Sequence, residues 1–74
     1  MEKSRLITEV ILLNRIKTYR FLRNKTQDDL MVQTRIDQSR ISRIERGVLK
    51  PTDEEKQKLA KALKTTAEKL FRNN

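Results

Sequence analysis

Turn-forming residues are almost absent from this chain, and this scarcity constrains its fold more than any other feature. Glycine and proline occur once each in 74 residues, as Gly47 and Pro51. Sandwiches and small barrels need many tight turns, whereas helices need only a stop signal between them. The sequence therefore predicts an all-α fold, in a single domain that spans residues 1–74.

Residues with helix-capping chemistry divide the chain into helices. The candidate N-caps are Thr26, Asp37, Thr52 and Thr66. Thr52 with Glu55 matches the capping-box pattern, and Gly47 suits the left-handed end of a helix. We predict a first helix that ends near Asn24, followed by helices near 27–34, 38–46, 53–63 and 67–72. A compact five-helix bundle is the expected architecture.

The chain is strongly basic, with 18 Lys and Arg against 10 Asp and Glu and a net charge of +8. A basic surface can serve solubility alone, but in so short a chain it favours a polyanionic partner such as nucleic acid. The charge is +5 in residues 1–25, +1 in 26–50 and +2 in 51–74. Because the middle segment is the least charged, its role depends on where its charges point.

Several classes of function lack their usual residues here. Cysteine and histidine are absent, so we expect no enzyme, no cofactor and no metal site. The apolar run from Leu6 to Leu13 is shorter than the roughly 18–20 residues of a membrane span. It resembles a signal-peptide core, but Glu9 interrupts it, and Asn14 and Arg15 follow where small residues should stand. The sequence predicts a cytoplasmic protein with no membrane partner.

The predicted helix over residues 38–46 has two different faces, at about 100° per residue. Ile41 and Ile44 share one face, and Ile36 folds onto it from the preceding turn. The opposite face and its flanks carry Gln38, Ser39, Arg40, Ser42, Arg43 and Arg46. Gln, Ser and Arg pair with base edges in the major groove. An ordinary amphipathic helix has the same pattern, so the pattern alone leaves both interpretations open.

The segment TQDDLMVQTRIDQSRISRIERG, residues 26–47, resembles without a gap the helix-turn-helix of the Cro and phage-repressor (XRE-type) regulators. The shared features are Thr26-Gln27, Ile36 and the stretch Ile41-Ser42-Arg43-Ile44-Glu45-Arg46-Gly47. The similarity extends over roughly residues 14–71. It implies a lambda-repressor-like domain whose third helix enters the major groove of double-stranded DNA.

The resemblance also implies a role for individual residues. Base contacts fall to Gln38, Ser39, Ser42 and Arg43, and phosphate contacts to Gln27, Arg40, Arg46 and Lys50. For the three basic residues in the phosphate set, plain solubility remains an alternative. Arg20 and Glu45 match positions that form a structural salt bridge between the first and third helices of this family.

The chain departs from the family pattern at three positions. Arg35 stands where the turn between the second and third helices usually has glycine, at a cost on the order of 1 kcal/mol if the residue is left-handed. Thr34 replaces a usual leucine, and Lys56 replaces a usual apolar residue of the fourth helix. We therefore expect a thin core that needs support from elsewhere.

Residues 1–13 form an apolar extension with Leu6, Ile7, Val10, Ile11 and Leu13. Ser4 could cap an extended first helix of about twenty residues, but the β-branched content also permits a strand. The segment could add to the core of its own chain, contact a second copy or lie on a membrane surface. Glu9 and the short length disfavour the membrane. We favour the contact between two copies, because so many apolar groups would otherwise form an exposed patch.

Together these features predict a sequence-specific transcriptional regulator, most simply a repressor, that binds a pseudo-palindromic operator as a homodimer. The alternative is an antitoxin or another protein-interaction partner that uses the same fold to hold a second protein. An enzyme acting on nucleic acid is disfavoured, because the chain has neither His nor Cys.

Overall fold

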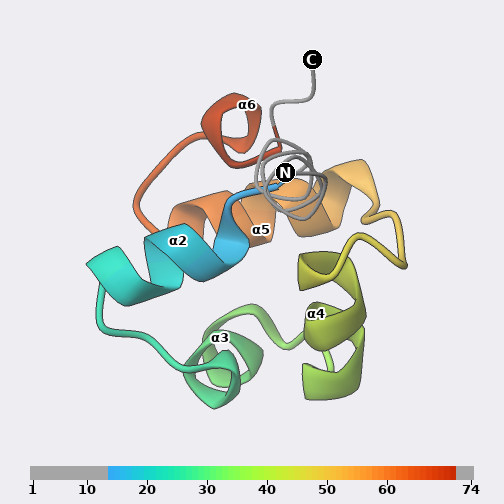
Figure 1. The fold of residues 1–74 in the computed structure, drawn as a ribbon, viewed down its shortest axis with the longest axis horizontal. Helices are drawn as coiled ribbons and strands as arrows, with labels where there is room; N and C mark the ends of the chain where they lie inside the picture. The colour runs from blue at the N-terminus through green and yellow to red at the C-terminus, as the bar shows by residue number, and fades with distance from the viewer. Residues whose placement is uncertain (1–13, 72–74) are drawn as a thin grey trace, which may run out of the picture.

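The structure, a computed structural model, describes residues 14–71 and contains helices and no strand within them. The helices are α2 (Ile16–Leu22), α3 (Gln27–Thr34), α4 (Gln38–Glu45), α5 (Asp53–Ala62) and α6 (Ala67–Leu70) (Figure 1). The predicted all-α fold is confirmed. The starts predicted for α3 to α6 coincide with the observed ones, and the predicted ends lie within two residues of them.

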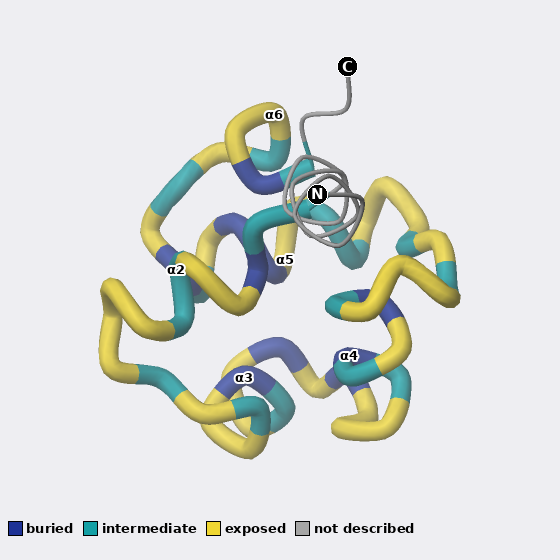
Figure 2. The backbone as a smooth tube through the Cα atoms, in the orientation of Figure 1, coloured by how far each residue is buried: buried dark blue, intermediate teal, exposed yellow. Residues whose placement is uncertain are grey.

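The helices surround one small core. α3 packs against α4 and α5, and α5 also contacts α6. In Figure 2 the buried stretches of the helices turn toward the centre of the molecule. The core consists of Ile16, Leu30, Ile36, Ile41, Ile44, Leu59, Ala60, Leu63 and Leu70. Since Ile41 and Ile44 anchor α4 with exposed fractions of 0% and 1%, the opposite face of α4 must point outward.

Side chains cap the helix starts as the sequence predicts. Thr52 Oγ1 accepts from the Glu55 N–H at 3.1 Å, and the Thr52 N–H donates to the Glu55 carboxylate at 2.9 Å. The same reciprocal pair joins Thr26 and Asp29, at 3.0 and 2.9 Å. Here an aspartate replaces the usual Glu or Gln of a capping box, which is why the pattern was missed in the sequence. These capping boxes therefore define the first residue of α3 and of α5.

The structure corrects one expectation about the first helix. The possible helix of about twenty residues starting at Ser4 would pass through positions 14 and 15, but α2 begins only at Ile16. The Arg15 N–H donates to the Leu70 carbonyl at 2.8 Å, and the Ile16 N–H donates to Asn14 Oδ1 at 3.3 Å. Because these donors face tertiary and side-chain acceptors, a continuous helix through them is not formed. Residues 1–13, helix or strand, lie outside the described part.

Arg35 closes α3 in the left-handed conformation, with φ 62° and ψ 23°. This is the geometry that the missing glycine would adopt without a steric cost. The Arg35 N–H still donates to the Met31 carbonyl at 2.7 Å, so the turn keeps its hydrogen bond. The helix-turn-helix therefore has its usual turn, and the arginine carries the strain.

We expect Arg35→Gly to stabilise the protein by up to about 1 kcal/mol. Glycine removes the left-handed strain, and its greater freedom in the unfolded chain offsets part of the gain. Urea unfolding monitored by circular dichroism measures the change. Arg46→Gly is the matched control, because Arg46 has a right-handed φ of −81° and should lose stability. A loss of stability in both variants would contradict the strain at Arg35.

The two polar replacements, Thr34 in the core and the partly exposed Lys56, are both accommodated. Thr34 is buried, and its hydroxyl donates to the Leu30 carbonyl at 2.6 Å and accepts from the Ile36 N–H at 3.2 Å. The Lys56 ammonium lies 5.9 Å from the ring centroid of Phe71, where the aromatic face attracts a cation. Hydrogen bonding in the turn and a cation–π contact thus take the place of apolar packing.

Candidate nucleic-acid interface

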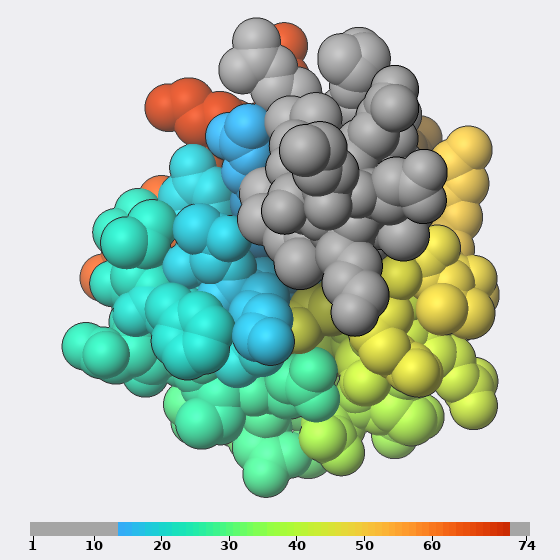
Figure 3. Space-filling model, viewed as in Figure 1, coloured from blue at the N-terminus to red at the C-terminus, as the bar shows by residue number. Residues whose placement is uncertain are grey.

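The outward face of α4 carries the residues expected to contact base edges. Gln38, Ser39 and Arg43 are exposed, and Ser42 is half-buried. Within residues 14–71 the guanidinium of Arg43 has no hydrogen-bond or ion-pair partner. The surfaces of α3 and α4 adjoin along one edge of the molecule (Figure 3). The structure therefore presents these side chains together on one helix face.

Gln27 and Gln38 connect the starts of the two helices. Gln38 Nε2 donates to Gln27 Oε1 at 3.1 Å. The pair leaves the Gln38 amide oxygen and one N–H available, and the Gln27 side-chain NH₂ lies at the N-terminus of α3. Backbone amides at such a terminus favour an anionic oxygen. Gln27 thus orients Gln38 and keeps its own NH₂ group at the N-terminus of α3.

Asp37 caps α4 and fixes the orientation of Ser39. Its carboxylate accepts from the Ser39 N–H at 3.1 Å and from the Ser39 hydroxyl. These bonds stabilise the ionised form and hold the pKa of Asp37 below its ordinary value of 3.8. Since the Ser39 proton points to Asp37, its oxygen remains as an acceptor, which suits a base amino group.

Arg40 is expected to contact phosphate, but it lies against a carboxylate. Its Nε and Nη2 donate to the two oxygens of Glu55 at 2.5 and 3.0 Å. The hydrogen bond from Arg40 keeps the pKa of Glu55 below its ordinary value of 4.5. This bidentate pair joins α4 to the start of α5, and it reduces the positive charge that Arg40 can offer to DNA.

The loop after α4 carries the two remaining phosphate candidates. Gly47 has a φ of 75°, and the N–H groups of Val48 and Leu49 both donate to the Arg43 carbonyl, at 2.9 and 3.2 Å. These bonds close the helix end and direct the loop back toward α5. Arg46 and Lys50 are exposed on either side of this closure. Both lie on the C-terminal side of the α4 surface.

Arg20 and Glu45 form the salt bridge expected from the family resemblance. Arg20 Nε and Nη2 donate to the Glu45 carboxylate at 2.6 and 3.1 Å, and Arg20 Nη1 donates to the Lys25 carbonyl at 3.2 Å. The two side chains are only 13% and 7% exposed. The pair joins α2 to the end of α4 and connects to the loop before α3, so it fixes the orientation of the outward face.

Sequence reasoning missed two residues that hold the helices together, Asn14 at the end of α4 and Arg23 at the end of α5. Asn14 Nδ2 donates to the carbonyls of Ile44 and Glu45, at 2.8 and 3.2 Å. Arg23 Nε donates to the Leu63 carbonyl at 2.9 Å and joins α2 to the end of α5. Asn and Arg at a helix boundary are common, and their acceptors lie 30 and 40 residues away in the sequence. No local pattern could have identified these partners.

Acid should destabilise the protein through three carboxylates on this surface. The Thr26 N–H holds the pKa of Asp29 below 3.8, as Ser39 does for Asp37 and Arg40 does for Glu55 below 4.5. Because folding lowers these pKa values, the stabilisation is complete above the ordinary values and is lost as the pH falls through the folded ones. We expect the melting temperature to fall below a pH of about 4.5. Asp37→Asn should make the fall of the melting temperature with pH shallower. If that fall were as steep as in the natural protein, Asp37 would not be one of the groups responsible for it.

Comparison with known proteins gives one match. A family model described as Helix-turn-helix matches residues 16–70, which cover most of the chain. No curated protein and no solved structure shows significant similarity to it. Among residues 14–71, no helix is long and apolar enough to cross a membrane. The matched region begins with α2 and ends with α6, so it contains α4 and the Arg20–Glu45 pair that orients it, whereas Asn14 lies just outside.

Proposed function

Since the chain belongs to the helix-turn-helix family of Cro and phage-repressor (XRE-type) regulators, a family of DNA-binding proteins, we propose that it recognises one specific double-stranded sequence and represses transcription there. The observation that carries this proposal is the outward face of α4, with Gln38, Ser39 and Arg43 exposed on a helix anchored by buried isoleucines. A rigid helix that presents Gln, Ser and Arg side chains suits major-groove readout.

Each outward residue of α4 has a distinct chemical role in this proposal. Arg43 pairs with a guanine, and Gln38, oriented by Gln27, pairs with an adenine. Ser39 accepts from a base amino group, and the half-buried Ser42 contributes a shorter contact. Together they read a short half-site, since one recognition helix reaches only a few base pairs.

Phosphate contacts hold the helix in register. Gln27 at the start of α3 and the exposed Arg46 and Lys50 beyond α4 lie at the two ends of the reading face, so they can hold the DNA backbone on both sides of the groove. Arg40 makes a smaller contribution, because Glu55 shares its charge. Such contacts give affinity without sequence preference and weaken as salt is added.

We further propose that two copies bind a pseudo-palindromic operator in the cytoplasm. One recognition helix covers too little DNA for high specificity, and a two-fold dimer doubles the site. Occlusion of RNA polymerase is the simplest route from such binding to repression.

Selection from a pool of random duplexes tests this proposal. We expect an inverted repeat whose half-site centres lie about 10–10.5 base pairs apart, or a multiple of that spacing. The double variant Gln38→Ala with Arg43→Ala is the control, because it removes base contacts and leaves the buried anchors intact. It should enrich no consensus. Failure of the natural protein to enrich any consensus would reject sequence-specific binding, and a single unrepeated half-site would reject the dimer.

A further inference from the structure

The candidate interface contains four cations, and only one of them forms an ion pair within residues 14–71. The four are Arg40, Arg43, Arg46 and Lys50. The paired one is Arg40, and its partner is the carboxylate of Glu55 in the first turn of α5, outside the helix-turn-helix itself. The Arg40 side chain is 39% exposed and the Glu55 side chain 16%. The guanidinium thus reaches solvent beside α4, while the carboxylate is largely covered.

The helix cap of α5 holds the Glu55 carboxylate in place. Glu55 Oε1 accepts from the Thr52 N–H at 2.9 Å and from Arg40 Nη2 at 3.0 Å, and Glu55 Oε2 accepts from Arg40 Nε at 2.5 Å. Ordinary surface ion pairs contribute little, partly because two long side chains must lose their freedom. Here the cap has already fixed one of them, and two parallel bonds fix the other. Glu55 therefore holds Arg40 more firmly than an exposed carboxylate would.

A DNA phosphate would need the same N–H groups of Arg40. Carboxylate and phosphate oxygens both bind the planar fork of a guanidinium through two parallel bonds. Arg40 follows Ser39 on α4 and lies on the flank of its outward face. Phosphates border the groove that a recognition helix enters, so a cation on the flank of that helix faces them. Glu55 and a phosphate therefore compete for the Nε and Nη2 groups of Arg40.

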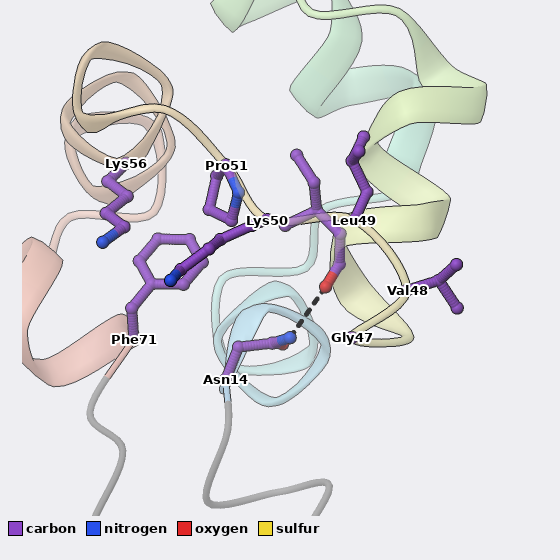
Figure 4. A pocket seen from close by; sticks show the side chains of 9 residues that line it. Asn14, Gly47, Val48, Leu49, Lys50, Pro51, Lys56 and Phe71 are labelled. Atoms are coloured by element: carbon purple, nitrogen blue, oxygen red, sulfur yellow. Dashed lines mark hydrogen bonds between the residues drawn. The ribbon is translucent and has the colours of Figure 1, made fainter.

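Lys50, in the loop beyond α4, is in the opposite situation. It is exposed, and it forms no ion pair with any residue of the described chain. In Figure 4 its side chain extends toward Phe71, and none of the residues that line the pocket around it is acidic. The charge of Lys50 is thus available to a phosphate at once, whereas Arg40 must first leave Glu55.

We propose, on the basis of the proposed function, that Glu55 competes with the DNA backbone for Arg40 and thereby limits the affinity of the protein for DNA of any sequence. Cations on phosphates supply nearly all of the affinity for unrelated DNA, so holding one cation back lowers that affinity. Base contacts through Gln38 and Arg43 do not depend on it. Glu55 thus weakens attachment to the backbone and leaves recognition to the bases, although it lies outside α3 and α4.

Glu55→Gln tests the competition on a duplex of shuffled sequence. The glutamine amide oxygen still accepts from the Thr52 N–H, so the capping box is kept while the charge that holds Arg40 is removed. For each bound copy we expect about five- to tenfold tighter binding at roughly 0.1 M salt and a salt slope about 0.9 steeper, as for one additional phosphate contact. Fluorescence anisotropy over a series of salt concentrations measures both.

Glu54→Gln is the matched control, because it removes the same charge from the neighbouring residue. Glu54 is 78% exposed and faces Lys58 at 3.4 Å, and it forms no ion pair with the four interface cations. Solvent and salt screen its charge, so binding should change by less than about twofold. Equal gains in the two glutamine variants would reflect net charge alone and would overturn the competition.

Arg40→Gln shows whether Glu55 acts through Arg40. Alone, it should weaken binding to the shuffled duplex by less than about threefold, whereas Lys50→Gln should weaken it by about five- to tenfold per bound copy. Equal losses in these two variants would overturn the proposal, and this comparison does not require Glu55→Gln to fold. In the presence of Arg40→Gln, Glu55→Gln should no longer raise the affinity. If it raised the affinity as much as before, the carboxylate would act on DNA directly, and the proposal would be wrong.

The shuffled duplex separates failure of this role for Glu55 from failure of the proposed function. If the natural protein bound the duplex and Glu55→Gln brought no gain, the role of Glu55 would be wrong and the proposed function would be untouched. Absence of binding to every duplex would reject the proposed function and the role of Glu55 with it.

Discussion

Glu45→Ala should lower the free energy of unfolding by about 3–5 kcal/mol, the loss typical of breaking a buried ion pair. The Arg20 and Glu45 side chains are 13% and 7% exposed, and two hydrogen bonds join them. Without Glu45, the Arg20 guanidinium stays largely buried, and among residues 14–71 it keeps only the Lys25 carbonyl as an acceptor. An uncompensated buried charge is costly for so small a domain. Urea unfolding at neutral pH measures the loss.

Glu54→Ala is the matched control for this loss. Glu54 also faces a cation, Lys58, at 3.4 Å, but the two side chains are 78% and 47% exposed. Water screens such a pair, so its removal should cost less than about 1 kcal/mol. If the two alanine variants lost stability equally, burial would not be the reason for the effect, and the structural role assigned to Arg20 and Glu45 would be wrong.

Arg43→Ala should weaken binding by about 5- to 150-fold for each half-site of the selected operator, which corresponds to the 1–3 kcal/mol of one bidentate base contact per bound copy. It should also relax the preference at a single base position per half-site. The reason is structural, because the exposed Arg43 side chain has no partner among the described residues and is available to a base. Binding to the operator and to duplexes that vary each position measures both effects.

Lys50→Ala separates base recognition from charge. Lys50 is exposed on the loop beyond α4, where we propose a phosphate contact. Its removal should weaken binding to all duplexes alike and reduce the salt slope by about one for each bound copy. If Arg43→Ala behaved in the same uniform way, Arg43 would be a phosphate contact and the assignment of base contacts would fail.

Much of the fold could be predicted because its signals are local. Thr52 with Glu55 is a pattern within one helical turn, and it placed the start of α5 correctly. Arg35 was identified as the residue under strain because it stands where the family pattern has glycine, and its φ is 62°. The two faces of α4 followed from the spacing of Ile41 and Ile44. Each of these features depends on residues close in the sequence, whose geometry the helix dictates.

The candidate site was less predictable because its contacts are distant in the sequence. The pair of Arg40 and Glu55 joins two helices, and nothing near Arg40 indicates that its charge is shared. Asn14 contacts the end of α4 from 30 residues away. Such partners are set by helix packing, which sequence periodicity does not specify. The family resemblance supplied Arg20 and Glu45 only because it carries packing information from other chains.

One measurement tests most directly whether this protein recognises a specific DNA sequence. It is the ratio of the dissociation constant for a shuffled duplex to that for the selected operator of equal length, at one salt concentration. Sequence-specific regulators typically bind their site at least about a thousandfold more tightly than unrelated DNA. We predict a ratio of that size, with both affinities falling steeply as salt is raised. A ratio near one at every salt concentration would show that the basic chain binds DNA only by charge, and it would contradict the reading of bases by α4.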